Sequence, residues 1–149
     1  MKILILSHYF PPEVNAPAKR IYDHAKIFSD LGHEVIVITN FPNHPSGKLF
    51  KGYKNKWVSI NLTENINIIR VFSYLTPNKG FIRRSINYFI YMLLSTLQGF
   101  RIKDVDIILA TSPQLLCGLA GMILSKIKKK PFIFEIRDIW PESIASVGL

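Results

Sequence analysis

Short runs of consecutive apolar residues alternate with amphipathic stretches along this chain, and this alternation limits the possible folds more than any other feature. Residues 2–6 and 34–39 are apolar at almost every position, as strands that are buried on both faces of a sheet are. The stretch between them, from about residue 16 to residue 31, has apolar residues at helical spacing: Ile21, Ala25, Phe28 and Leu31. This pattern predicts a strand–helix–strand unit with a right-handed crossover.

The same alternation continues to the end of the chain. Residues 66–72, 106–110 and 131–136 read as further strands, and residues 79–102 and 114–128 read as helices. Residues 41–65 contain turn residues and scattered charges, which predicts a long excursion with little regular structure. The predicted fold is α/β: a doubly wound, mainly parallel, Rossmann-like sheet with helices on both faces.

The composition narrows the function classes. Nineteen Lys and Arg against ten Asp and Glu give a net charge of +9, which favours anionic partners such as phosphates or an anionic membrane face. The single cysteine, Cys117, excludes an internal disulfide framework and a cysteine-based zinc site, and it suits a reducing compartment. The apolar run that follows Lys2 is too short for a signal peptide, and the stretch 88–94 is too short to span a bilayer.

Polar residues follow each predicted strand at the end where ligands bind in doubly wound sheets. They are Ser7-His8, Thr39-Asn40, Ser73-Tyr74, Thr111-Ser112 and Arg137-Asp138. Polar residues end most strands, and this ordinary explanation covers much of the pattern. It fits the charged pair Arg137-Asp138 less well. There an arginine can hold phosphate oxygens in a forked geometry, and an aspartate can accept a proton or a sugar hydroxyl.

The turn after the first strand has no glycine, because the first glycine of the chain is Gly32. This argues against a dinucleotide-binding fingerprint and a P-loop. Asn15 is a plausible N-cap for the helix that starts near Ala16, and such a helix end offers N–H groups and a positive dipole to an anion. An ordinary capped helix start explains these residues equally well.

Three cations, Lys79, Arg83 and Arg84, cluster at the start of the long predicted helix. Cations there oppose the helix dipole, which points to an external anion such as a lipid phosphate or a diphosphate. An apolar stripe follows them: Ile86, Phe89, Ile90, Leu93 and Leu97. The stripe suits either an interfacial membrane contact or packing between the sheet and its neighbours. We favour packing for the stripe and ligand binding for the arginines.

Lysines and aromatic residues interleave between Lys48 and Trp57. Such a surface can stack bases or meet lipid headgroups, but no nucleic-acid-binding module accompanies it. A solvated loop explains it better, and we expect no nucleic-acid partner. A nucleic-acid-binding protein therefore ranks third among the hypotheses. His8 and His44 as lone histidines, and Cys117 in an apolar helix, are most simply structural residues.

Taken together, several short motifs make the chain similar to a known family. They are Tyr9-Phe-Pro-Pro-Glu13, Leu31-Gly-His-Glu-Val35, Phe41-Pro-Asn-His-Pro-Ser-Gly47, Gly52-Tyr53, Ile69-Arg-Val71, Thr111-Ser-Pro113 and Arg137-Asp-Ile-Trp-Pro-Glu-Ser143. In this order they resemble the amino-terminal half of family 4 glycosyltransferases with the GT-B fold, of the bacterial lipopolysaccharide, capsule and colanic-acid type. The motifs run almost from end to end of the chain.

This resemblance implies that residues 1–149 form one Rossmann-like acceptor-binding domain, truncated before the donor-binding half. The implied enzyme passes a sugar from a nucleotide-sugar donor to a polyprenyl-diphosphate-linked saccharide, without metal, at the cytoplasmic face of the membrane. The nucleotide sugar is then a substrate held mainly by the second half, so no cofactor is expected. This domain alone is expected to be inactive.

The resemblance also implies roles for individual residues. On the donor side it places Asn15, Ala16 and Arg137, and on the acceptor side His8, His44, Arg83, Arg84, Thr111 and Ser112. Asp138 is the candidate catalytic group. The chain departs from many relatives in two places, since Asn15-Ala16-Pro17 replaces a glycine pair and Thr111-Ser112 replaces a histidine. The alternative hypothesis is a non-catalytic membrane-docking subunit that recruits a separate donor-binding chain.

Overall fold

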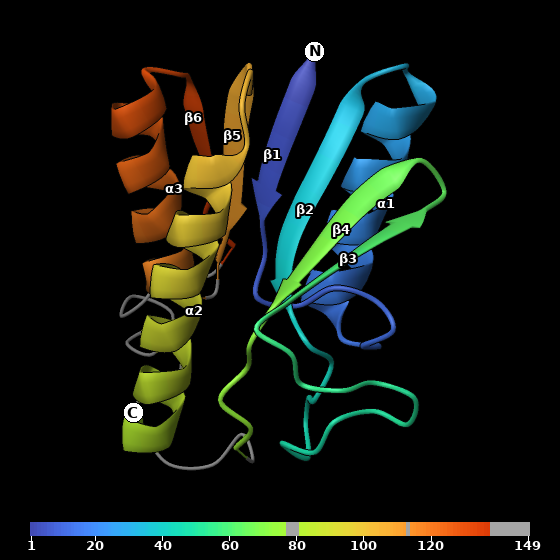
Figure 1. Ribbon diagram of the computed structural model, residues 1–149, viewed down its shortest axis with the longest axis vertical. Coiled ribbons are helices and arrows are strands. Elements are labelled where there is room, and N and C mark those ends of the chain that lie inside the picture. The colour runs from blue at the N-terminus through green and yellow to red at the C-terminus, as the bar shows by residue number, and fades with distance from the viewer. Residues whose placement is uncertain (77–80, 113, 138–149) are drawn as a thin grey trace, which may run out of the picture.

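The computed structural model describes residues 1–76, 81–112 and 114–137, and Asp138 and Lys79 lie outside these ranges. The described chain contains a single sheet flanked by helices (Figure 1). Its elements, in chain order, are β1 Lys2–Leu6, α1 Ala16–Asp30, β2 Glu34–Asn40, β3 Val58–Thr63, β4 Ile66–Val71, α2 Phe81–Arg101, β5 Ile107–Thr111, α3 Leu115–Lys128 and β6 Phe132–Glu135.

The sheet is mainly parallel, with strand order β3-β4-β2-β1-β5-β6. Strand β1 lies at its centre, with Ile3 opposite Val35 of β2 on one side and opposite Ile107 of β5 on the other. Only β3 runs antiparallel to its neighbour. Connections to β2 and β4 run in one direction from β1, and connections to β5 and β6 run in the other. The predicted α/β doubly wound class is therefore confirmed.

Each face of the sheet carries its own hydrophobic core, because successive side chains of a strand point to opposite faces. Ile3 and Ile5 of β1 pack with Ile21 and Ala25 of α1 on one face. Leu4 and Leu6 pack on the other face with α2 and α3, in a cluster that includes Cys117. The predicted structural role of Cys117 is confirmed, and burial raises the pKa of its thiol to about 12.

Helix α1 begins and ends as its sequence predicts. Asn15 caps it, because its Oδ1 accepts a hydrogen bond from the Ala18 amide at 2.9 Å. Gly32 follows its last turn with a φ of +84°, a conformation that glycine adopts without strain. Leu31 is the exception to the predicted apolar face: it stands at the C-cap and is exposed.

The prediction of an irregular segment over residues 41–65 was wrong for its last third, which forms strand β3. The strand pairs with β4 through a tight turn at Glu64 and Asn65, both with positive φ. This turn has no glycine, the usual sequence signal of such a hairpin. In addition, β3 is an edge strand whose apolar residues Ile60 and Leu62 stay 67% exposed, so it does not read as a buried strand.

The predicted packing of the α2 stripe was also wrong. Ile86, Phe89, Leu93 and Leu97 are all exposed, and Ile90 is only partly buried. The buried face of α2 is instead formed by Asn87, Tyr91, Met92, Ser95 and Gly99. Small residues let the helix approach closely, and a Cβ on Gly99 would lie 2.4 Å from Leu124 Cδ1. The Tyr91 hydroxyl donates a hydrogen bond to the Ile38 carbonyl at 2.8 Å, which satisfies it inside the core.

Candidate functional site

The carboxyl ends of the parallel strands meet at one edge of the sheet, as the sequence predicts. Ser7 follows β1, Thr111 ends β5 and Arg137 follows β6, and these three strands are neighbours in the sheet. Hydrogen bonds tie the ends together, since the Ser7 amide donates to Ile38 of β2 and the Ser112 amide to Glu135 of β6. The predicted convergence of polar residues at this edge is therefore confirmed.

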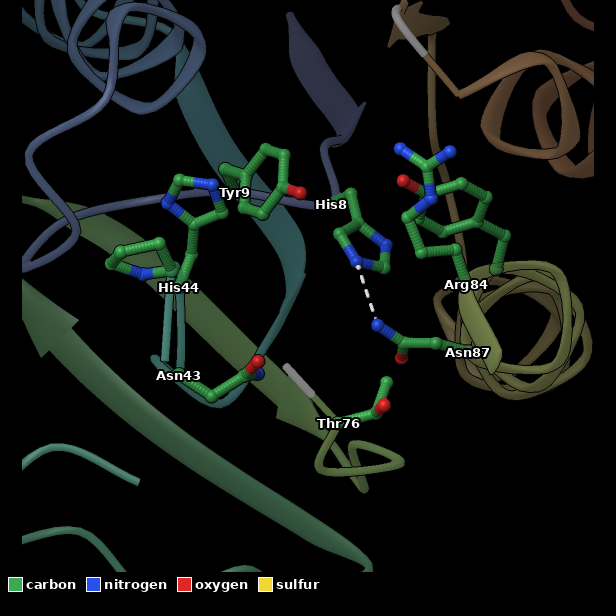
Figure 2. Close-up of a pocket in the computed structure, with 9 residues that line it drawn as sticks. His8, Tyr9, Asn43, His44, Thr76, Arg84 and Asn87 are labelled. Carbon is green, nitrogen blue, oxygen red and sulfur yellow. Dashed lines mark hydrogen bonds between the residues drawn. The ribbon is translucent and has the colours of Figure 1, made fainter. Parts of the chain in front are cut away.

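A pocket lies at this edge, on the face of the sheet that α2 covers. It contains about 290 Å³ of space between its side chains, a volume that includes open solvent. The loops after β1, β2 and β4 and the first turns of α2 bring its side chains together (Figure 2). The lining residues are His8, Tyr9, Asn43, His44, Pro45, Thr76, Arg84, Asn87 and Tyr88. Three predicted acceptor-side residues, His8, His44 and Arg84, thus share one cavity.

His8 forms the inner wall of the pocket and is neutral. It is 3% exposed, and burial, with a smaller contribution from His44, lowers its pKa to about 3. The amide nitrogens of Asn40 and Asn87 lie 3.0 and 3.4 Å from Nε2, and Figure 2 shows the second contact. Amide NH₂ groups donate, so they suit an imidazole nitrogen that accepts and oppose a charged ring with two N–H groups.

Arg84 supplies the cation of the pocket. Its Nε is buried and has no hydrogen-bond partner among the described residues, and the same is true of Asn87 Oδ1 one turn later on α2. Asn40 Oδ1, beside His8, is a third buried atom without a partner in the described ranges. Buried polar atoms are rarely left unpaired in folded proteins, so this group of unpaired donors and acceptors points to a polar ligand.

Tyr9 is a second neutral group in the pocket. Burial, assisted by Tyr88 and Glu13 and opposed by Arg84, raises its pKa above the ordinary range for a tyrosine. Its ring meets those of His8 and His44 edge to face, with centroids 4.9 and 5.1 Å apart. The cavity therefore combines one arginine, neutral hydrogen-bonding groups and aromatic rings. Sugar hydroxyls and phosphate oxygens are the ligands such a set recognises.

The loop that carries Asn43 and His44 is held by a buried carboxylate. Glu13 Oε1 accepts hydrogen bonds from the amides of Asn43 at 3.0 Å and of His44 at 2.9 Å. Burial raises the pKa of Glu13, although these two amides and nearby Arg70 oppose that effect. Glu13 therefore fixes one rim of the pocket. His44 stands on that rim, where partial burial lowers its pKa.

The predicted donor-side residues lie beyond β1 and β6. The N-terminus of α1 offers little to an anion, because Asn15 occupies the Ala18 amide and Pro17 has no N–H. Ala16 stands exposed in this first turn. The Nε of Arg137 is buried and meets no partner in the described part of the chain, so it is the stronger ligand candidate on this side.

Thr111 and Ser112 serve the fold rather than the pocket. The Thr111 hydroxyl donates to Glu135 at 2.7 Å, and the Ser112 hydroxyl accepts from the Arg137 amide at 2.7 Å. Glu135 also pairs with Arg20 at 3.1 Å. Burial raises the pKa of Glu135, but the hydrogen bonds from Thr111 and Arg20 outweigh it and leave that pKa below its usual range.

Two further predicted site residues, Arg83 and Asp138, are not part of the pocket as the structure describes it. Arg83 is exposed and does not line the pocket, although its neighbour Arg84 does. Asp138, the candidate catalytic group, lies outside the described residues. Within residues 1–76, 81–112 and 114–137, no cluster of His, Cys, Asp and Glu is placed to hold a metal ion.

Sequence reasoning missed two amides and a tyrosine of the pocket. Asn43, Asn87 and Tyr88 carried no signal of their own, because asparagine is common in loops and Tyr88 looked like part of an apolar helix. Asn87 lies three residues after Arg84, on the same side of α2, and this spacing was the one available clue.

Comparisons with known proteins bear on the fold alone. No family model matches the chain, and no curated protein matches it. Among solved structures, the chain is similar to the C-terminal domain (residues 78–226) of a hydrogenase from Pyrococcus furiosus, with a TM-score of 0.56 and 17% identity over 90% of each chain. At this identity the likeness shows a shared α/β architecture.

Proposed function

We propose that this chain is the acceptor-binding domain of a GT-B glycosyltransferase of cell-surface polysaccharide synthesis. The observation that carries the proposal is the pocket in which His8, His44 and Arg84 meet at the carboxyl edge of the sheet. Its arginine, its neutral amides and its tyrosines match a saccharide that carries a phosphate. The motifs that resemble family 4 enzymes support the same assignment.

In this proposal, the pocket holds the acceptor sugar and part of its polyprenyl diphosphate. The Arg84 guanidinium binds phosphate or hydroxyl oxygens in a forked geometry. Asn87 Oδ1, unpaired within the described residues, accepts from a sugar hydroxyl. His44 at the rim has a lowered pKa, so it is neutral near pH 7 and can accept a proton from an attacking hydroxyl.

The nucleotide-sugar donor belongs to the other side of the sheet centre, with a second Rossmann-like half supplying most of its contacts. Arg137 has a buried Nε that is free of protein partners within the described ranges, which suits a donor phosphate. Asp138, the next residue, stays the candidate polar group at the junction of donor and acceptor. The metal-free mechanism implied by the family resemblance is part of the proposal.

Sugar transfer by the complete gene product tests the proposal. Labelled nucleotide sugars are screened against prenyl-diphosphate-linked saccharides, and the active pair is then measured with Arg84→Gln. This variant should lower kcat/KM by at least about a hundredfold, because a charge-assisted contact is lost in a buried site. Lys103→Gln, which removes an exposed cation between α2 and β5, is the matched control and should stay near wild type. Equal rates for the two variants contradict the proposed site.

A further inference from the structure

The side of α2 that is turned away from the sheet is apolar along its whole length. Between Arg84 and Arg101, every exposed position of the helix is occupied by Ile, Leu or Phe. We call these residues, with Ile82 one turn earlier, the α2 outer face: Ile82, Ile86, Phe89, Leu93, Leu97 and Phe100. Their spacing of three or four residues places them in one stripe opposite the buried Tyr91 and Ser95.

Helix α3 extends this surface on the same side of the sheet. It packs beside α2 in the same layer (Figure 1), and its exposed residues before Lys126 are Leu115, Leu119 and Met122. A surface helix normally places charged or polar residues at such positions. Exposed apolar residues along the faces of two neighbouring helices mark an interaction site rather than an ordinary solvent face.

The charge pattern around this surface indicates its partner. Neither α2 nor α3 contains a single carboxylate. Exposed arginines stand at both ends of the α2 outer face, Arg83 at the start and Arg101 at the end, and α3 carries Lys126 and Lys128 in its last turn. An apolar stripe bounded by cations, with no acidic residue, complements a surface that is apolar inside and anionic at its boundary.

The same charges disfavour a second copy of this chain as the partner. If two α2 helices paired antiparallel, Arg83 of one would lie beside Arg101 of the other. If they paired parallel, each arginine would lie beside its own equivalent. Both arrangements bring like charges together with no carboxylate on either helix to offset them.

From these observations we propose that the α2 outer face docks the domain flat on an anionic lipid membrane. Helix α2 lies parallel to the membrane plane over its length of about 30 Å, with Phe89, Leu93 and Phe100 inserted below the headgroups. Arg83 and Arg101 extend their side chains to lipid phosphates. Within the described residues, no helix has the length and apolarity to cross a bilayer, and docking in the plane requires neither.

This docking also orients the pocket. Arg84, Asn87 and Tyr88 line the pocket from the inner side of α2, while Ile86 and Phe89 belong to its outer face. The pocket therefore lies within one helix diameter, about 10 Å, of the docked surface. The docking inference itself rests on exposure and charge and does not depend on the sugar chemistry.

Vesicle co-sedimentation of the 149-residue chain, without any sugar donor, tests the docking. The chain should bind phosphatidylglycerol vesicles at least tenfold more tightly than phosphatidylcholine vesicles. The double variant Phe89→Gln/Leu93→Gln should lower the affinity at least tenfold, because it removes two apolar side chains that are each 50% exposed. The matched control is Ile60→Gln/Leu62→Gln on β3, which changes two equally apolar exposed residues and should bind like wild type.

Circular dichroism checks that each variant is folded, and a second pair, Ile82→Gln/Phe100→Gln, replaces the first if it is not. Absence of binding to anionic vesicles overturns the proposal, as does equal binding by the outer-face and β3 variants. A dimer in sedimentation velocity that the outer-face variant dissolves, with no vesicle binding, overturns it in favour of an interface between copies. None of these results bears on sugar transfer, so docking and the proposed activity fail or succeed separately.

Discussion

Acid should destabilise this protein through His8 in a way that can be calculated. In the folded chain the pKa of His8 is lowered from 6.5 to about 3, mainly by burial. In the unfolded chain His8 therefore binds a proton below about pH 6.5, whereas in the folded chain it binds one only near pH 3. The folded state has its full stability above pH 6.5 and loses it progressively as the pH falls toward 3.

The size of the effect at pH 5 depends little on how far the pKa is lowered. About 1.5 pH units separate pH 5 from the pKa of an ordinary imidazole, and each unit is worth about 1.4 kcal/mol. Between about pH 7.5 and about pH 5, His8 should therefore lower the free energy of unfolding by about 2 kcal/mol. Any folded-state pKa below about 4 gives the same result.

Urea unfolding at these two pH values, in wild type and in His8→Gln, measures this contribution. The glutamine keeps an acceptor in the pocket but cannot be protonated, so the variant should lose about 2 kcal/mol less on acidification. Comparing the two proteins cancels other titrations, including Glu13, whose raised pKa acts in the opposite direction. Identical pH dependence in wild type and His8→Gln would refute the reasoning.

Packing and hydrogen bonds give three predictions for the free energy of unfolding, each measured with urea at about pH 7.5. Gly121→Ala should cost about 1–3 kcal/mol, because a Cβ there would lie 2.4 Å from the Phe132 ring; an unchanged stability would mean that the ring has room to move. Glu13→Ala should cost about 2 kcal/mol or more by leaving two loop amides unpaired, whereas Glu13→Gln should keep most of that stability, and equal losses would contradict this. Tyr91→Phe should cost about 1 kcal/mol through the lost hydrogen bond to the Ile38 carbonyl, and an unchanged midpoint would show that the bond contributes nothing.

The parallel strands were predictable because strands buried on both faces leave a direct trace in the sequence. The runs at β1 and β2 are apolar at successive positions, and few other structures require that. Strand β3 left no such trace, because it is exposed at the sheet edge and turns at Glu64 and Asn65 without a glycine. Its pairing with β4 is a tertiary contact that local sequence does not encode.

The orientation of α2 could not be predicted, because both sides of the helix are apolar enough to pack against the sheet. Its apolar stripe looked like the packing face, but close approach to the sheet and to α3 selected Gly99 and Ser95 instead. The pocket was predictable in part. His8 was found from its place after a strand, whereas Asn87 needed the contact between α2 and the β1 loop.

The most direct test of the pocket assignment is a nuclear magnetic resonance titration of the chain with a short-chain prenyl-diphosphate sugar. The imidazole signals of His8 and His44 should shift together and saturably, with the side-chain amide of Asn87, while those of His24 and His33 stay in place. Saturable shifts confined to the second pair, or no shifts at millimolar ligand, would contradict the assignment of this pocket as the acceptor site.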